Sequence, residues 1–385
     1  MTRIEAEWLA APANRAVMAA LGDAWYVGGC VRNALMGLSP GDIDLATPLR
    51  PEETTRRLQQ AGLKVVPTGI DHGTVTAVCE GQGFEVTTFR ADLETDGRHA
   101  VVRFSTEMAE DAARRDFTIN ALYADGAGAV CDPLGGLPDL AARRVRFIGD
   151  AERRIAEDYL RILRFFRFYA WYGEGTIDRA GLAACTAMVD GLTRLARERV
   201  GVEIRKLLSA PDPAPSIAAM ADSGVLAAAL PGADTVRLTR YLAAEYAAGT
   251  DPDWIGRLAA MRPKAAGDAL RLSRLDHRAL DTLLALGAMD APVEEAAYHH
   301  GLRIARAHAL TQGPHAEWDE VALRIERAAA ARLPLTARDL SSAGIEPGPE
   351  MGAALGRAEE AWIASGFSLD KAALLQKAKR KGHIH

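Results

Sequence analysis

The sequence predicts an α+β protein, in which a small mixed sheet occupies residues 1–147 and an all-α region follows. Short β-branched or alternating segments, bounded by Gly, Asp or Pro, are concentrated before residue 147. From residue 148 the chain is rich in Ala, Leu and Arg, with helical periodicity and almost no strand pattern. Breaks that contain Pro or Gly divide this region into about ten expected helices.

Individual elements follow from local patterns. The expected strands cover residues 25–29, 42–46, 73–79 and 84–89. A helix is expected to begin at Pro51, because Pro favours the first turn and two acidic residues follow it. A second helix is expected over Glu152–Phe168, with its charged residues gathered on one face and an apolar stripe on another.

Composition excludes several classes of protein. Of 385 residues, 49% are hydrophobic and 25% charged, which argues against disorder. Four dispersed cysteines without a C-x-x-C pair argue against a disulfide framework or a zinc site and suit a reducing cytoplasm. No apolar run reaches membrane-spanning length, so no membrane association is expected. The net charge of −5, taken alone, argues against a nucleic-acid partner.

Two short motifs point to phosphoryl transfer. On a strand, Asp42 and Asp44 would project from the same side and could hold Mg²⁺, the cation that neutralises a triphosphate. Upstream, the turn at Gly28 and Gly29 would let backbone N–H groups approach a phosphate. Glu85 lies in a nearby strand-like segment as a candidate third acid. Each motif alone is most often a solvated turn, and only their combination is informative.

Four motifs in order carry a family resemblance. They are Gly28-Gly29-Cys30-Val31-Arg32, Asp42-Ile43-Asp44, Arg114-Arg115-Asp116-Phe117-Thr118-Ile119-Asn120-Ala121 and Glu157-Asp158-Tyr159-Leu160-Arg161. With them the chain resembles the class II tRNA nucleotidyltransferases and bacterial poly(A) polymerases. The resemblance implies a polymerase-β-like catalytic head over 1–147, a base-selecting helical neck over 148–210, and an RNA-binding body and tail over 211–385.

The resemblance also implies residue roles. Asp42, Asp44 and Glu85 would form the catalytic acids, with Mg²⁺ on the first two. Nucleotide would be bound by Gly28, Gly29, Arg32, Arg114, Arg115, Asp116, Asn120, Asp158, Arg161 and Arg164. The family usually has Asp where this chain has Asn33, so the orientation of Arg32 is expected to be weaker here.

Asp158 and Arg161 would read the incoming base. A carboxylate can accept from the exocyclic amine of cytosine or adenine while a guanidinium donates to the adjacent ring nitrogen. Uracil and guanine would place a carbonyl and an N–H in those positions, and each unpaired group costs about 1–3 kcal/mol. From spacing alone, a solvated salt-bridged helix face is the more ordinary interpretation of the same residues.

The expected activity is addition of C, C and A to the 3′ end of tRNA from CTP and ATP. Poly(A) addition, A-only or CC-only addition, a small-molecule nucleotidyltransferase and a non-catalytic RNA-binding module remain alternatives. Between residues 143 and 167, eight Arg oppose four acids, and Lys377, Lys379, Arg380 and Lys381 add a basic tail. These basic segments fit an RNA acceptor arm, and no obligate protein partner is expected.

Overall fold

The computed structural model describes residues 2–70, 73–96 and 99–379, with side chains outside 92–102. The chain divides into two compact units, Met1–Ala229 and Leu230–His385. Arg380 and Lys381 of the expected basic tail lie outside the described residues. The expected functional boundaries at 147 and 210 stay a prediction.

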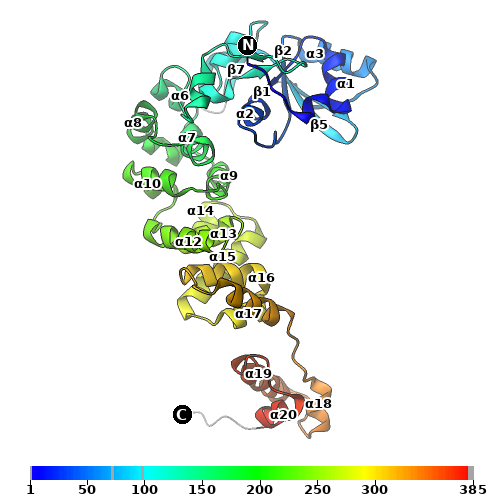
Figure 1. Ribbon diagram of the computed structural model, residues 1–385, viewed down its shortest axis with the longest axis vertical. Helices are drawn as coiled ribbons and strands as arrows, with labels where there is room; N and C mark the ends of the chain where they lie inside the picture. The colour runs from blue at the N-terminus through cyan, green and yellow to red at the C-terminus, as the bar shows by residue number, and fades with distance from the viewer. Residues whose placement is uncertain (1, 71–72, 97–98, 380–385) are drawn as a thin grey trace. The chain divides into compact units, whose positions relative to one another are not determined.

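A seven-stranded mixed sheet forms the frame of the first unit, in the order β3-β4-β5-β2-β1-β8-β9 (Figure 1). Its strands are β1 Trp25–Val27, β2 Asp44–Thr47, β3 Lys64–Gly69, β4 Thr74–Cys79, β5 Gln82–Thr88, β8 Tyr123–Ala124 and β9 Val130–Cys131. β2 and β5 run parallel, and the other neighbouring strands are antiparallel. A separate hairpin pairs β6 Arg90–Asp96 with β7 His99–Phe104.

Helices surround this sheet and continue beyond it. Those up to residue 147 are η1 Glu7–Ala10, α1 Pro12–Leu21, α2 Gly29–Leu35, α3 Pro51–Gln60, α4 Met108–Ala113, η3 Thr118–Asn120 and α5 Gly136–Ala141. The remaining helices of this unit are α6 Ala151–Glu157, α7 Leu160–Tyr172, α8 Arg179–Ala187, η4 Val189–Arg194, α9 Arg197–Leu208, α10 Ala214–Asp222 and α11 Val225–Ala229. The helix expected at Pro51 is confirmed as α3.

An apolar core beneath β1, β2 and β8 fixes the segments that carry the site. Val27, Ala46 and Tyr123 from these strands are buried together with Phe89 and Ala121. Phe89 and Tyr123 meet edge to face, with ring centroids 6.2 Å apart. Because Ala121 belongs to this core, the polar segment just before it is held at the edge of the sheet.

The acidic motif lies at the start of β2 rather than inside it. β2 begins at Asp44, and Asp42 sits in the bend before it, so the prediction that both residues alternate along one strand was wrong. Gly41, with φ at 70°, keeps the preceding chain in a left-handed turn. Asp44 pairs in parallel register with Glu85 of β5, so these two side chains leave the sheet on the same face.

The single helix expected over Glu152–Phe168 is also a wrong prediction, because the chain is interrupted between α6 and α7. Asp158, between them, has an extended backbone with φ −157° and ψ 106°. Its carboxylate Oδ1 accepts a hydrogen bond from the backbone N–H of Leu160 at 3.1 Å. A short Asp side chain that bonds the backbone in this way competes with helix continuation and starts a new helix. Asp158 and Tyr159 therefore lie at a joint.

The second unit is all-α in its described part. It contains α12 Thr235–Ala247, α13 Trp254–Met261, α14 Ala266–Ala269, α15 Arg274–Met289, α16 Val293–Thr311, α17 Trp318–Ala330, α18 Ala337–Ser342, α19 Pro349–Ala364 and α20 Lys371–Lys379. Fifteen α-helices, α6 to α20, thus follow residue 148 among the described residues, more than the ten expected, because several are only one or two turns long. No helix in the described ranges is long and apolar enough to cross a membrane.

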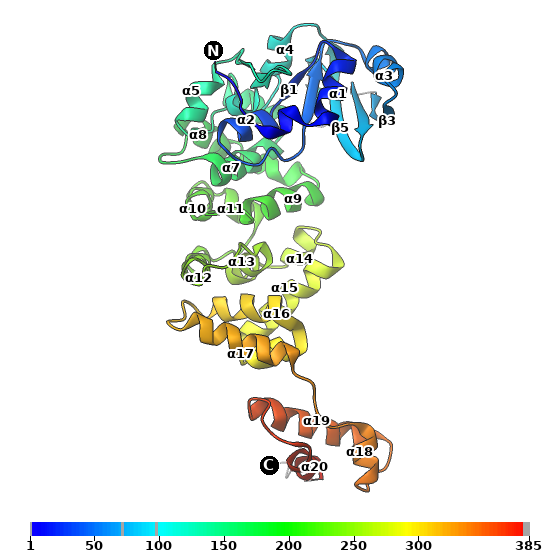
Figure 2. The same ribbon diagram turned by 45° about the vertical axis from the view of Figure 1, so that its right-hand side comes forward.

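Of three apolar clusters in the described part of this unit, one lies around Tyr241 of α12 and Leu310 of α16, and two are larger. One joins α15, α16 and α17 through residues such as Leu286, Ala305 and Ile325, and α16 and α17 lie side by side in both views (Figures 1 and 2). The other joins α18, α19 and α20 around Leu340 and Trp362.

Gly191 of η4 packs against the joint between α6 and α7. A Cβ atom on Gly191 would lie 1.8 Å from Cδ1 of Tyr159, which real structures do not tolerate. Gly191→Ala is therefore expected to displace Tyr159 and to lower the free energy of unfolding by about 1–3 kcal/mol, measured by urea denaturation. Gly126→Ala is the control, because its new Cβ would make an ordinary 3.6 Å contact with Met18. Equal stability of the two variants would contradict this packing argument.

Candidate functional site

One pocket of about 610 Å³ in the first unit gathers every predicted site residue except Glu85. Its walls come from the turn between β1 and α2, the bend before β2, the segment after α4, the joint at Asp158, and helices α7 and α9. The lining includes Gly28, Gly29, Arg32, Asp42, Asp44, Arg114, Arg115, Asp116, Asn120, Asp158, Arg161 and Arg164. Segments more than 100 residues apart in sequence thus share one cavity.

The pocket is strongly cationic although the chain is acidic. Eight basic side chains line it against four Asp side chains. The basic residues are Arg32, Arg114, Arg115, Arg161, Arg164, Arg167, Arg199 and Lys206. A cleft with this excess concentrates polyanions such as nucleoside triphosphates.

Asp44 lies where negative charge is concentrated. Burial and the nearby carboxylates of Glu85 and Asp42 raise the pKa of Asp44 to about 6. A divalent cation would relieve this repulsion, so Asp42 and Asp44 fit a magnesium site. Among the described residues, no group of three or more His, Cys, Asp or Glu side chains is arranged to hold a metal ion. The two carboxylates thus suit Mg²⁺ that keeps water and phosphate oxygens as its other ligands.

Glu85 stands apart from the pocket lining. It is exposed on β5 and adjoins Asp44 only through the strand register. Its charge contributes to the raised pKa of Asp44, so it acts on the site electrostatically in this structure.

Arg32 is buried beside the glycine turn and held on several sides. Its guanidinium lies 3.8 Å from the ring centroid of Tyr172 and 5.2 Å from that of Phe168. It also donates to the Tyr172 hydroxyl at 2.8 Å and to Oδ1 of Asn120. These contacts fix the direction of a cation at the pocket wall before any ligand binds.

Asn33 performs two functions at once. Its Oδ1 accepts from Nε of Arg32 at 3.1 Å and from Nη2 at 2.8 Å, so a neutral amide holds this guanidinium. Its Nδ2 donates to the backbone carbonyl of Ser39 at 2.8 Å. A carboxylate could not make this second bond, because it has no donor. Asn33 therefore also secures the chain that leads to Asp42.

A buried polar chain links the sheet side of the pocket to α7. Asp116 Oδ1 accepts from Nδ2 of Asn120 at 2.9 Å, and Oδ2 accepts from Nε of Arg164 at 2.8 Å. Burial alone would raise the pKa of Asp116, but Arg164 and these hydrogen bonds lower it to about 2. Asp116 is therefore a fixed negative charge with its partners already in place.

Arg115 is oriented by a residue that the sequence analysis did not single out. Asp111, buried at the end of α4, accepts from Nη2 of Arg115 at 2.9 Å and from the Tyr123 hydroxyl at 2.7 Å. A Cβ on Gly28 would lie 3.4 Å from Nη1 of Arg115, and Gly28 has a φ of 72°. Only glycine readily adopts this backbone so close to the guanidinium.

The proposed base-reading pair already has protein partners. Asp158 Oδ2 is 2.6 Å from Nη2 of Arg199, while Arg161 pairs with Glu157 and donates to the carbonyl of Arg154 at 2.8 Å. An ionised carboxylate has about four lone-pair sites and a guanidinium five donors, so each retains capacity for a base edge. The contacts with Arg199 and Glu157 orient the remaining acceptor sites of Asp158 and the remaining donors of Arg161.

Several lining residues were missed. Arg167 and Phe168 on α7, and Arg199 and Lys206 on α9, also face the pocket. The three-residue stride from Arg161 through Arg164 to Arg167 signals one helix face and could have identified Arg167. Phe168 carries no such signal, because an aromatic residue in a helix is most often part of a core.

Comparisons with known proteins agree with this arrangement. A profile of the Poly A polymerase head domain matches residues 24–146, and one described as a probable RNA and SrmB-binding site of polymerase A matches residues 176–236. A CCA-adding enzyme of Levilactobacillus brevis is 31% identical over 392 residues, covering 95% of this chain and 96% of that protein.

Other relatives match only in part or chiefly in fold. Mitochondrial CCA tRNA nucleotidyltransferase 1 of Mus musculus is 44% identical over 185 residues, which cover 47% of this chain. The chain spans about half the length, 43%, of that curated relative. The crystal structure of the Bacillus stearothermophilus CCA-adding enzyme with CTP superimposes with a TM-score of 0.71 at 25% identity, covering 96% of this chain and 97% of that one. The predicted fold and family are confirmed.

Asn33→Asp separates the two functions of this side chain. Asp keeps an acceptor for Arg32 but loses the donor to the Ser39 carbonyl, so backbone amides of residues 37–42 are expected to exchange with deuterium up to about tenfold faster. Hydrogen exchange read by mass spectrometry measures this. Arg56→Gln, on exposed α3, is the control. Unchanged exchange in the Asp variant would contradict the proposed tie.

Proposed function

This chain belongs to the family of the CCA-adding enzymes, and we propose that it adds C, C and A from CTP and ATP to the 3′ end of tRNA, releasing pyrophosphate. The observation that carries the proposal is a single cationic pocket lined by a carboxylate pair, fixed arginines and the Asp158–Arg161 pair. Relatives named for the same activity, covering most of this chain, support it.

The residues of the pocket bind and orient the triphosphate. Arg32 and Arg115 are held by hydrogen bonds and ion pairs on the sheet side, where they can meet phosphate oxygens without reorganisation. The Gly28–Gly29 turn, at the start of α2, lets backbone N–H groups approach the same oxygens. Fixing both the triphosphate and the RNA terminus converts the reaction into a positioned attack of the ribose hydroxyl on the α-phosphate.

Asp42 and Asp44 would hold magnesium. The ion, when bound, neutralises phosphate charge and favours the attacking oxygen as an alkoxide. Asp44 fits this role because burial, Glu85 and Asp42 raise its pKa more than Arg115 lowers it, whereas Arg164 holds the charge of Asp116 in the same pocket. Glu85, on the neighbouring strand β5, raises the pKa of Asp44.

Asp158 and Arg161 would select the base without a nucleic-acid template. Arg199 and Glu157 hold the two side chains in place, so the pair presents an acceptor beside a donor. This order matches cytosine and adenine and opposes uracil and guanine.

Two other activities are set against this one. Poly(A), A-only or CC-only addition would use the same pocket. Only the RNA product distinguishes these activities from CCA addition. A non-catalytic RNA-binding module has no use for the acidic pair at Asp42 and Asp44, which this chain retains.

The four cysteines, all free thiols, support a location in the cytoplasm.

Incorporation into tRNA that lacks its 3′ end tests the proposal. CTP alone is expected to add two residues, and CTP with ATP three, read on sequencing gels. Asp44→Asn should lower the rate by about a thousandfold or more, because a metal ligand is lost. Asp23→Asn, exposed and outside the pocket, should react normally. Continued extension by ATP alone on an untrimmed RNA would refute CCA addition.

Asp158→Asn tests base selection separately. The new amide can donate to the O4 carbonyl of uracil, so UTP incorporation relative to CTP is expected to rise by roughly tenfold, a difference of about 1.4 kcal/mol. Competition between labelled CTP and UTP measures the ratio. If the variant slows both nucleotides equally, Asp158 does not read the base.

A further inference from the structure

A second cationic pocket, the arginine pocket, lies within the Leu230–His385 unit and is named for Arg237, Arg240 and Arg262 in its lining. It measures about 190 Å³ and is enclosed by α12, α13, α15 and α16. Arg237 and Arg240 reach it from α12 and Arg262 from the end of α13, while Asp290 is the one acidic residue in its described lining. Its volume equals that of about six water molecules, enough for one phosphate group.

Arg262 is held in a defined position. Its backbone is left-handed, with φ at 48°, a conformation that is unfavourable for a residue other than glycine. Its Nη2 donates to the carbonyl of Gly287 at 3.1 Å. A Cβ on Gly287 would lie 3.1 Å from that same nitrogen, so the glycine leaves room for the guanidinium.

The arginines are not needed to cap α16, whose C-terminus borders the pocket. Three carbonyls of its last turn already have partners: that of His308 accepts from the Thr311 hydroxyl, that of Ala309 from Gln312 N–H and the His315 ring, and that of Leu310 from Gly313 N–H. Arg240 comes close to Gly313, with its Nη2 3.8 Å from a Cβ built on that residue, yet forms no ion pair among the described residues.

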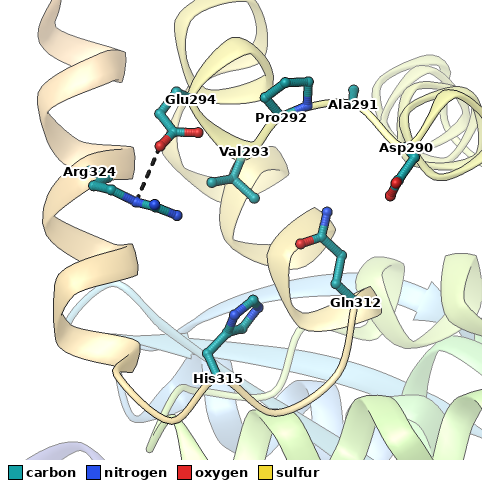
Figure 3. A pocket seen from close by; sticks show the side chains of 8 residues that line it. All are labelled: Asp290, Ala291, Pro292, Val293, Glu294, Gln312, His315 and Arg324. Atoms are coloured by element: carbon teal, nitrogen blue, oxygen red, sulfur yellow. Dashed lines mark ion pairs between the residues drawn. The ribbon is translucent and has the colours of Figure 1, made fainter. Parts of the chain in front are cut away.

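A neighbouring pocket of about 520 Å³ provides a contrast (Figure 3). It shares Asp290 and Gln312 with the arginine pocket. There Arg324 faces Glu294, with Nε and Oε1 3.2 Å apart, so its charge is already balanced. Among the described residues, Arg237 is the one arginine of the arginine pocket with such a partner, an exposed pair with Asp234 at 3.2 Å. Exposed ion pairs of this kind contribute little stability, so Arg237 can leave Asp234 to contact another anion.

His308 adds an unused acceptor to the arginine pocket. The side chain lines the cavity and is only 1% exposed. Its Nε2 lies 2.7 Å from the carbonyl of Ala291 and so carries the proton, while Nδ1 has no hydrogen-bond partner among the described residues. Buried acceptors without a partner are rare in native proteins, which points to a hydroxyl or water donor at this position.

We propose that the arginine pocket binds a phosphate of the RNA backbone. An RNA segment supplies phosphate oxygens for Arg240 and Arg262, and its ribose hydroxyls add donors beside each phosphate. Inorganic phosphate carries the same anionic chemistry without the ribose. The inference rests on the proposed function only in taking tRNA as the RNA.

The test measures binding of tRNA lacking its 3′ end by fluorescence anisotropy at several salt concentrations. Arg240→Gln and Arg262→Gln are each expected to weaken binding about tenfold and to lower the salt slope of log K by about one. Arg306→Gln is the matched control, because Arg306 also lies exposed in this unit but pairs with Glu326 at 2.8 Å outside the pocket. The KM for CTP should stay unchanged in all three variants.

Tenfold weaker RNA binding by both pocket variants, with the control unchanged, supports the proposal. Affinity and salt slope equal to those of the Arg306 variant would overturn it. Thermal stabilisation by inorganic phosphate that disappears in Arg240→Gln, without any loss of RNA affinity, would also overturn it by assigning the pocket to a free anion. The binding assay needs no turnover, so absence of CCA addition in the wild type would refute the activity and leave this test intact.

Discussion

The ion pair between Asp116 and Arg164 is the interaction on which the rest of the site depends. Asp116 belongs to the segment beside the sheet, and Arg164 to α7, so this pair joins the two walls of the pocket. Asp116 is buried, while 32% of the Arg164 side chain is exposed, so loss of Arg164 would leave a buried carboxylate without its cationic partner. Asn120 extends the hydrogen-bonded chain from Asp116 to Arg32, so the wall that carries the glycine turn is tied to the wall formed by α7.

The surroundings of two carboxylates in the pocket shift their pKa values in opposite directions. Asp116 has a strongly lowered pKa because Arg164 and Asn120 satisfy its charge, whereas the pKa of Asp44 rises because burial and like charges act on it. The charge of Asp116 is thus balanced within the protein, whereas the charge of Asp44 is opposed by its neighbours. Divergent environments for similar acids are a mark of functional sites, and here they separate the residue that builds the pocket from the residue that would bind a cation.

The sequence predicted the fold class and the members of the pocket better than its local geometry. Motif order identified residues from Gly28 to Arg164 because their chemistry is encoded in residue type. The bend at Asp42 and the break at Asp158 were missed, since helix and strand periodicity does not register a side chain that bonds the nearby backbone. Phe168 was missed because its importance comes from a tertiary contact to Arg32 that no local pattern contains. Asp111 was missed although its i, i+4 spacing to Arg115 is a local pattern, because that spacing is also typical of an ordinary exposed helix pair.

Net charge was misleading because electrostatic recognition depends on local fields. The chain carries −5 overall, yet the pocket of the first unit has twice as many basic as acidic lining residues, and the arginine pocket has three to one. At physiological salt a charge acts over about 8 Å, so distant surface acids barely affect either pocket. In both places the decisive feature is how the cations are held: Arg32 by Asn33 and Tyr172, and Arg262 by its backbone and Gly287. A cation fixed in this way binds phosphate without first losing conformational freedom, which a flexible surface lysine cannot do.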